Sequence, residues 1–397
     1  MDKQTFLSRY LVDRRGTDSY KWDGMLEEKF GSRDLTSMWI ADMEFKTPEA
    51  VVDALVRRAQ NGVFGYSSVP EKCYKAYSDW MERRYDFPLQ KEWLRFTTGC
   101  VTAIAWMVQA FTKPGDPCLI LTPVYYPFHN VVTYNDRRLV TVDLHYKEGR
   151  FALDYDAIEK AIVDNGVKLF IQCSPHNPAG RVWTEDELDR LFSICRRHGV
   201  LVVSDEIHQD LVLTGRRFVP AAVVSGGAYR DMVVTLSSAS KTFNLATLIH
   251  AHIIITDDKL RETYDHWARG MNRTENNVLG LEAAWAGYTY GEDWLSGLLA
   301  VIRDNYEYMK RELNARAPKV IVCPLEGTYL ALLDLRQCMD AKEVKDFILK
   351  GCRLAVDYGE QFGEHFEGFV RLNLATDPAL VEKAVNSIIT ELEKRHS

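Results

Sequence analysis

The strongest constraint on the fold is an alternation between short strand-like runs and helical patterns. Runs of four or five residues occur at Cys118–Leu121, Arg138–Val142, Leu169–Cys173, Leu201–Ser204, Val233–Leu236 and Ile253–Thr256. Helical periodicity occurs at Pro48–Asn61, Glu71–Tyr85, Cys100–Phe111, Tyr155–Asn165 and Thr184–Arg197. Continuous apolar strands alternating with helices are typical of a mostly parallel sheet with helices on both faces. The pattern therefore predicts an α/β fold with a ligand site at the carboxyl ends of the strands.

The pattern changes after Gly291. A long helix is predicted over Glu292–Arg316, and the rest of the chain is strand-like at Val320–Cys323, Tyr329–Leu335 and Gly368–Leu374, and helical at Ala341–Leu349 and Pro378–Arg395. The 397 residues also exceed the scale of about 150 for one domain. We therefore expect a large domain over 48–290 and a smaller α+β domain over 291–397. Residues 1–47 are irregular and aromatic-rich, and we expect them to pack with the small domain.

Composition narrows the function classes. The net charge of −7 argues against nucleic acid or an anionic membrane surface as a partner. No apolar run reaches the roughly 18 residues of a membrane span, and the first residues show no signal-peptide pattern. The eight cysteines form no C-x-x-C and several lie in apolar runs, which predicts reduced thiols and a cytoplasmic protein. The ten histidines show no metal-ligand spacing, so no metal site is expected.

Three polar residues follow predicted strands. Asp205 follows VLVVS, Asn177 lies between prolines in CSPHNPAG, and Lys241 lies among serines in TLSSASKTFN. Asp205 and Asn177 each have an ordinary alternative, because acids often cap helices and His-Asn-Pro is good turn chemistry. A lysine at the end of a buried strand is costly as a cation but well placed as a neutral amine. Together the three side chains predict a ligand site at one edge of the sheet.

Two further stretches favour the same site, although a glycine before a helix is usually only structural and two loop tyrosines are as often a packed pair. Gly99 precedes the helix that begins at Cys100, and the unpaired N–H groups of such a helix can bind an anion. Tyr125 and Tyr126 form a stiff aromatic loop between two prolines. The sequence contains no G-x-S-x-G, H-E-x-x-H, Walker loop or G-x-G-x-x-G that would indicate another chemistry.

The order of these motifs resembles fold-type I pyridoxal-phosphate enzymes of the class I/II aminotransferase family. Within that family the chain is similar to the cystathionine/cysteine β-lyase (C–S lyase) subgroup. The matching stretches are KWDGM, WIADMEFKTPEA, GYSSVPE, TPVYYPF, CSPHNPAGRVW, SDEIHQDL, SKTFN, EGTYLALLDL and FVRLNLAT. They extend from residue 21 to residue 376, so the resemblance covers nearly the whole chain.

The resemblance implies pyridoxal 5′-phosphate as the cofactor and assigns residues to its ring. Lys241 is expected to bind the cofactor aldehyde covalently, and Asp205 to pair with the protonated ring nitrogen. Asn177 is expected to donate to the ring's 3-oxygen, with His208 near the same atom. Tyr125 is expected to stack on the ring face.

The resemblance also assigns the phosphate and the substrate. The phosphate would be held by Gly99, Cys100 and Val101 at the helix N-terminus, by Ser238 and Ser240, and by Tyr66. Tyr66 is implied to reach this phosphate across the interface of a homodimer. The substrate carboxylate would be bound by Arg371 and Asn177, under the backbone of Ile40 and Ala41. Tyr126 is expected beside Lys241 as a second catalytic residue.

The resemblance leaves two activities open. A β-lyase would cleave cystathionine or a cysteine-type amino acid to a thiol, pyruvate and ammonia. An aminotransferase would use the same site with a keto acid. His208 and the lack of an arginine eight residues after Lys241 favour the lyase, whereas Thr247 and Ala239 depart from common family choices. A non-enzymatic regulatory role is a third hypothesis, and the complete set of site residues argues against it.

Overall fold

The computed structural model describes residues 1–272 and 276–396 and is built around a sheet of seven strands. The strands are β2 (Leu94–Thr97), β3 (Pro117–Thr122), β4 (Arg138–Asp143), β7 (Leu169–Cys173), β8 (Leu201–Asp205), β9 (Val233–Ser237) and β10 (Ala251–Ile254), in the order β2-β10-β9-β8-β7-β3-β4. Every neighbouring pair is parallel except those of β10, which is antiparallel to both neighbours. The predicted α/β fold with a mostly parallel sheet is confirmed, although neither β2 nor the direction of β10 was predicted.

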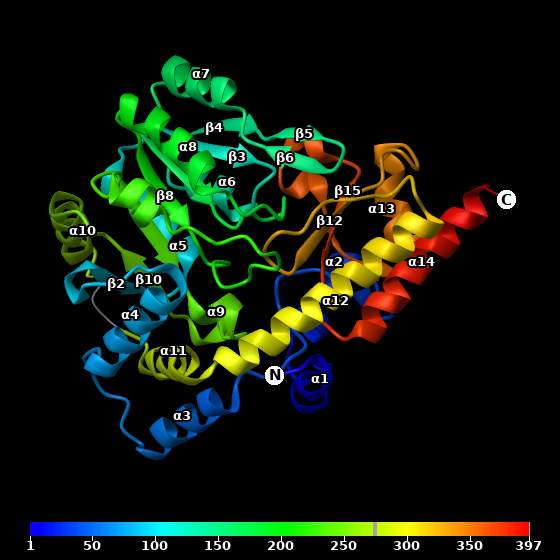
Figure 1. The fold of residues 1–397 in the computed structure, drawn as a ribbon, viewed down its shortest axis with the longest axis horizontal. Coiled ribbons are helices and arrows are strands. Elements are labelled where there is room, and N and C mark those ends of the chain that lie inside the picture. The colour runs from blue at the N-terminus through cyan, green and yellow to red at the C-terminus, as the bar shows by residue number, and fades with distance from the viewer. Residues whose placement is uncertain (273–275, 397) are drawn as a thin grey trace.

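Helices cover both faces of this sheet (Figure 1). One face packs against α5 (Cys100–Phe111), α6 (Pro127–Thr133) and α10 (Asp258–Gly270), and the other against α7 (Tyr155–Asn165) and α8 (Glu185–Arg197). On β3, Cys118 and Ile120 join the first core, and Leu119 and Leu121 join the second. Successive side chains of a strand point to opposite faces, so a strand buried on both faces needs an unbroken apolar sequence.

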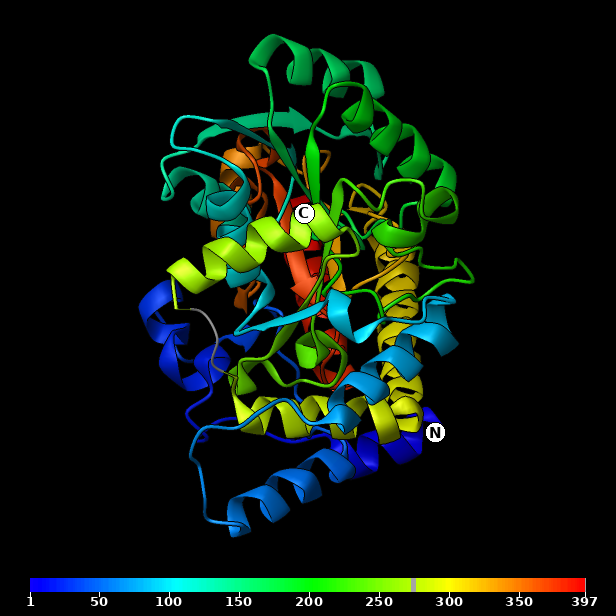
Figure 2. The same ribbon diagram turned by 90° about the vertical axis from the view of Figure 1, so that its left-hand side faces the viewer.

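A second group of helices lies at the edge of the molecule far from α7 in both ribbon views (Figure 2). It contains α3 (Glu49–Gln60), α4 (Glu71–Tyr85) and α11 (Val278–Tyr290), and α11 contacts both of the others. The short helix α9 (Ala239–Thr242) follows β9 directly and carries Lys241. The hairpin of β5 (His145–Lys147) and β6 (Arg150–Ala152) follows β4.

The long helix α12 (Glu292–Arg316) leads to a second sheet (Figure 1). This antiparallel sheet has the order β11 (Ile321–Val322), β12 (Leu330–Asp334), β15 (Phe369–Asn373) and β14 (Asp357–Tyr358). The last helix, α14 (Pro378–His396), packs along α12. The predicted helix over Ala341–Leu349 is instead a 3₁₀ turn, the short α13 (Val344–Asp346) and a π-turn over Phe347–Gly351. Among the helices of the described residues, none has the length and apolarity required to cross a membrane.

The N-terminal segment, which pattern alone did not place, lies against the C-terminal elements. It contains α1 (Lys3–Tyr10), a π-turn over Tyr20–Gly24, α2 (Leu26–Phe30) and β1 (Thr36–Ser37). Strand β1 pairs in parallel with β13 (Leu354–Ala355), and α1 contacts α12. The division into 1–47, 48–290 and 291–397 stays a prediction.

Candidate active site

The main candidate site is a cavity of about 940 Å³ at the carboxyl ends of β7, β8 and β9. The register aligns Cys173, Asp205 and Leu236 across these three strands, so the loops that follow them meet at one edge of the sheet. Of the predicted residues, the cavity is lined by Ile40, Ala41, Gly99, Cys100, Val101, Tyr125, Tyr126, Asn177, Asp205, His208, Ser240, Lys241 and Arg371. Ser238 and Tyr66 do not line it in the single chain.

Lys241 lies in α9, immediately beyond the buried strand β9. Its Nζ donates a hydrogen bond to the backbone oxygen of Ala41 over 2.7 Å. Burial lowers the pKa of Lys241 to about 8, because the charged form loses its hydration. A substantial fraction of this amine is therefore neutral, and able to act as a nucleophile or base, near physiological pH.

Asp205 ends β8 and is almost fully buried. Its Oδ1 accepts from the backbone N–H of Ile207 over 3.1 Å, and within the described residues the carboxylate forms no ion pair. Burial raises the pKa of Asp205 to about 7. A buried carboxylate without an ion-pair partner is suited to bind a ligand whose cationic group would pair with it.

Arg371 of the small antiparallel sheet contacts Asn177, which follows β7 of the large sheet. Arg371 Nη1 donates to Asn177 Oδ1 over 2.8 Å, and its Nη2 pairs with Asp357 Oδ2. The Nε of Arg371 is buried and has no hydrogen-bond partner among the described residues. Burial alone would raise the pKa of Asp357, but the positive charges of Arg371 and Lys29 outweigh it and lower that pKa. The guanidinium is thus fixed in orientation, and its Nε–H remains available to a ligand.

His208 faces the cavity from the turn after β8. Its Nδ1 is buried without a partner among the described residues, and its ring lies 6.0 Å from that of Tyr329 in an edge-on arrangement. Burial lowers the pKa of His208 to about 3, so the imidazole stays neutral. A neutral imidazole with an unpartnered nitrogen can donate to or accept from a ligand oxygen.

Two tyrosines form the aromatic wall. The rings of Tyr125 and Tyr126 lie edge to face with their centroids 5.3 Å apart. Tyr125 is largely buried, and burial raises its pKa to about 12. Tyr126 is 46% exposed, and burial raises its pKa as well. Tyr125 is therefore placed as a fixed surface for a flat ring, while Tyr126 can contact a group that enters from solvent.

The helix N-terminus beside the cavity provides an anion site. Helix α5 begins at Cys100 after Gly99, and no side chain caps its first N–H groups. Ser240 lines the cavity nearby. Ser238 instead accepts from the amide of Ser240 over 3.0 Å and donates to the backbone oxygen of His250 over 2.7 Å. Free N–H groups and a hydroxyl at a helix N-terminus fit a phosphate.

Sequence reasoning missed three acidic residues of this cavity, Asp18, Asp42 and Asp357, of which the last two pair with arginines. Asp357 on β14 lies directly across from Arg371 on β15, and only the pairing of these two strands reveals the contact. Asp42 follows Ala41 and forms an ion pair with Arg14 of 2.6 Å. The motif WIADMEF pointed to this segment, but nothing in it distinguished Asp42 from a surface acid.

Tyr66 is fully exposed in the single chain, in the connection between α3 and α4. Val63 and Phe64 beside it are also more than half exposed. The predicted role of Tyr66 at a phosphate therefore requires a second copy of the chain.

The fold and this cavity define an α/β enzyme built around a strand-end lysine. The chain belongs to the family Aminotransferase class I and II, whose sequence profile matches residues 33–388. It is 37% identical to cystathionine beta-lyase PatB of Bacillus subtilis, over 95% of this chain and 97% of the relative. It is 31% identical to protein MalY of Escherichia coli, over 96% and 97%. The PLP-bound C–S lyase of Staphylococcus hominis has the same fold, with a TM-score of 0.89, 32% identity and coverage of 96% and 97%.

Proposed function

We propose that this protein is a pyridoxal-phosphate-dependent C–S β-lyase that cleaves cystathionine or a cysteine-type amino acid. The observation that carries the proposal is the convergence of Lys241, Asp205, Asn177 and Arg371 on one cavity. The relatives support the same reaction class, since one is named a cystathionine beta-lyase and another a C–S lyase.

The residues of the cavity fit the cofactor. Asp205 is a buried carboxylate without an ion-pair partner in the described chain, which suits a protonated ring nitrogen. His208 Nδ1 is a buried atom without a partner, which suits a ring oxygen. The uncapped start of α5 suits a phosphate, and Tyr125 suits a ring face. Lys241 would hold the cofactor covalently through its Nζ.

When bound, the cofactor supplies an electron sink for the electron pair left when the substrate loses its α-proton. Asp205 keeps that sink effective by holding the ring nitrogen protonated. Lys241, as a neutral amine of low pKa, takes the α-proton. Arg371 binds the substrate carboxylate through its free Nε–H and with a donor that now contacts Asn177, which fixes the α-carbon beside Lys241.

The leaving group distinguishes a lyase from an aminotransferase. Loss of the α-proton allows the Cβ–S bond to break, and we assign protonation of the departing sulfur to Tyr126, which lines the cavity and is half-exposed. The remaining three-carbon enamine takes up water to give pyruvate and ammonia. An aminotransferase would return the proton from Lys241 and would require a keto acid.

The test is turnover of the purified enzyme with cystathionine and no keto acid. We expect pyruvate and a thiol in equal amounts over many turnovers. Product that forms only when a keto acid is added would show that the enzyme is an aminotransferase and not a lyase. Lys241→Ala should lose the visible absorbance of the covalently bound cofactor, whereas Lys160→Ala, on the surface, should keep it. An unchanged spectrum of Lys241→Ala would disprove the role of Lys241.

The proposal includes a homodimer and a cytoplasmic location. The exposed side chains of Val63 and Phe64 support a second copy of the chain, because they leave apolar surface open to solvent. They lie beside Tyr66, the residue to which the family resemblance gives a role at the phosphate. All eight cysteines are free thiols and seven are buried, which supports a reducing compartment.

A further inference from the structure

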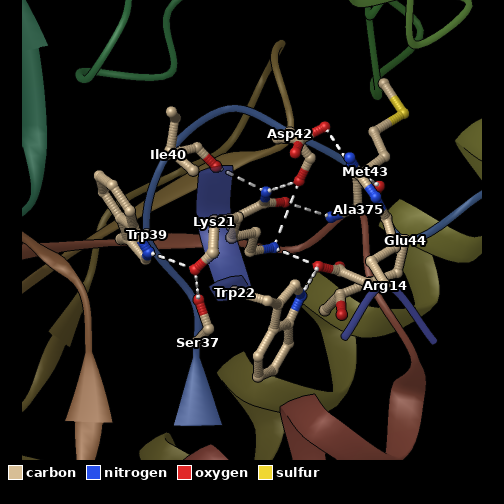
Figure 3. A network of polar contacts seen from close by, with 12 residues as sticks. Arg14, Lys21, Trp22, Ser37, Trp39, Ile40, Asp42, Met43, Glu44 and Ala375 are labelled. Atoms are coloured by element: carbon tan, nitrogen blue, oxygen red, sulfur yellow. Dashed lines mark hydrogen bonds and ion pairs between the residues drawn. The ribbon is translucent and has the colours of Figure 1, made fainter. Parts of the chain in front are cut away.

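Lys21, in the motif KWDGM, is fully buried although it carries a charge. Its Nζ forms an ion pair with Glu44 Oε1 at 2.6 Å and donates to the backbone oxygen of Asp42 over 3.3 Å (Figure 3). The same Glu44 oxygen accepts from Trp22 Nε1 over 3.1 Å. Buried ion pairs contribute little net stability compared with apolar packing, so this pair calls for another explanation.

The backbone of Lys21 holds a second part of the same segment. Lys21 lies in the π-turn Tyr20–Gly24. Its carbonyl oxygen accepts from Trp39 Nε1 over 3.1 Å and from Ser37 Oγ over 3.3 Å (Figure 3). The side chain of Lys21 therefore contacts residues that follow Ala41, and its carbonyl oxygen contacts residues that precede Ile40.

The segment Ile40–Glu44, which Lys21 contacts, has a constrained backbone. Ile40 has a φ of +46°, in the left-handed region that β-branched residues rarely adopt. Its N–H donates to Asp357 Oδ2 over 3.1 Å. Asn373 Nδ2 donates to the backbone oxygens of Ile40 and Asp42, over 2.8 and 2.6 Å. Without such contacts, Ile40 would relax to an extended conformation and Ala41 would turn away from its present direction.

The direction of Ala41 matters because its carbonyl accepts the hydrogen bond from Lys241 Nζ over 2.7 Å. We propose that Lys21 is a positioning residue for Lys241, acting through the segment Ile40–Glu44 that it holds in place. The proposal rests on the proposed role of Lys241 but concerns a residue that does not line the cavity.

The consequence for Lys241 follows from charge. A carbonyl acceptor and the nearby carboxylate of Asp42 favour the protonated amine, so moving them away lowers its pKa. The other titratable or charged groups that face Lys241 are Cys100, Asp205, His208 and Arg371. None of these is contacted by Lys21, so the direct effect of replacing Lys21 falls on the carbonyl of Ala41 and the carboxylate of Asp42.

The experiment measures acetylation of Lys241 by acetic anhydride in the full-length protein freed of cofactor, across a pH series, with the modified peptide quantified by mass spectrometry. In the unaltered protein the midpoint is expected near pH 8. In Lys21→Met it should fall by at least about half a pH unit, which is roughly threefold more neutral amine at a pH below the midpoint. The midpoint is the readout because easier access would raise the rate at every pH and leave the midpoint unchanged.

Two further variants separate positioning from stability. Lys21→Met combined with Glu44→Gln removes the unpaired buried carboxylate, so it should recover thermal stability and still show the lowered midpoint. Asp265→Asn, which breaks the Arg95–Asp265 pair away from the cavity, should lose stability with an unchanged midpoint. A midpoint near pH 8 in the Lys21/Glu44 double variant would overturn the proposal.

If the Lys21 variants do not fold, Asn373→Ser tests the same segment through its other anchor. A lowered midpoint there supports the proposal, and an unchanged one overturns it. The labelling needs no substrate and no turnover, so it tests the role of Lys21 even if the lyase activity is absent.

Discussion

Arg371 of β15 donates to the side-chain oxygen of Asn177, which follows β7, over 2.8 Å. This contact joins the small antiparallel sheet to the edge of the large parallel one. It places the guanidinium that we propose to bind the substrate carboxylate beside the strand ends that carry Asp205 and Lys241. The reaction therefore depends on how the two sheets sit relative to each other.

The first prediction concerns Arg371→Lys. A lysine offers a single point of contact where the guanidinium offers a fork, so the variant loses the paired donors to a carboxylate. We expect KM for the amino-acid substrate to rise about 10- to 100-fold, the equivalent of roughly 1.5–3 kcal/mol for hydrogen bonds to a charged group. Arg336→Lys, in the same part of the fold and paired with Asp334, is the control and should leave KM unchanged. Equal KM values for the two variants would show that Arg371 does not bind the substrate carboxylate.

The second prediction concerns the pH dependence of stability. Asp205 has a pKa of about 7 when folded, against 3.8 for an ordinary aspartate, so folding favours its protonated form. The contribution of Asp205 to the free energy of unfolding is fully present below pH 3.8, where the carboxyl is protonated. It is lost as the pH rises from about 4 to about 7. In the cofactor-free protein, Asp205→Asn should therefore raise the free energy of unfolding at pH 8 by roughly 2–4 kcal/mol and change it little at pH 4. Urea unfolding at both pH values measures this.

The control for Asp205 is Asp357→Asn. The charges of Arg371 and Lys29 hold the pKa of Asp357 below its ordinary value, so its ionised form stabilises the fold. Replacing it should lower the free energy of unfolding at pH 8, the opposite sign to Asp205→Asn. Two variants that shift stability in the same direction would contradict the opposite roles of these buried carboxylates.

The third prediction assigns Tyr126 to the leaving group. Tyr126→Phe keeps the ring but removes the hydroxyl, so protonation of a departing thiolate should slow and kcat should fall about 10- to 100-fold. With 3-chloroalanine the leaving chloride needs no proton, and the same variant should lose far less. Tyr125→Phe serves as the comparison, since stacking does not depend on its hydroxyl. An equal loss with both substrates would mean that Tyr126 acts before the β-bond breaks.

The fourth prediction places Tyr66 in the partner's site. Tyr66→Ala and Lys241→Ala should each be nearly inactive alone, the first through weakened phosphate binding. Refolding the two together should form mixed dimers with one complete site each, which restores about a quarter of the activity of the unaltered enzyme. Activity that stays at the level of the two separate variants would show that Tyr66 acts within its own chain or not at all.

Local sequence predicted the large sheet because its buried strands are short apolar runs and its helices repeat with a period of about 3.6 residues. The predicted helix Glu292–Arg316 coincides with α12, and Leu169–Cys173 coincides with β7. Periodicity predicted neither the reversed direction of β10 nor β2, because strand direction depends on pairing rather than on the side chains of the strand itself. The broken helix at Ala341–Leu349 likewise shows that packing can override a helical pattern.

The sequence by itself determined the strand-end residues Asp205, Asn177 and Lys241, because each directly follows a recognisable strand or lies in the loop after it. Tertiary structure alone decided what surrounds them. Asp357 faces Arg371 only through the pairing of β14 with β15, and Lys21 lies against the segment of Ala41 only because the chain turns back on itself within residues 1–47. Contacts between separate elements leave no local periodicity, whether the residues are 14 positions apart like Asp357 and Arg371 or 194 apart like Asn177 and Arg371. The pKa values and orientations of the site therefore emerge only when the chain is folded.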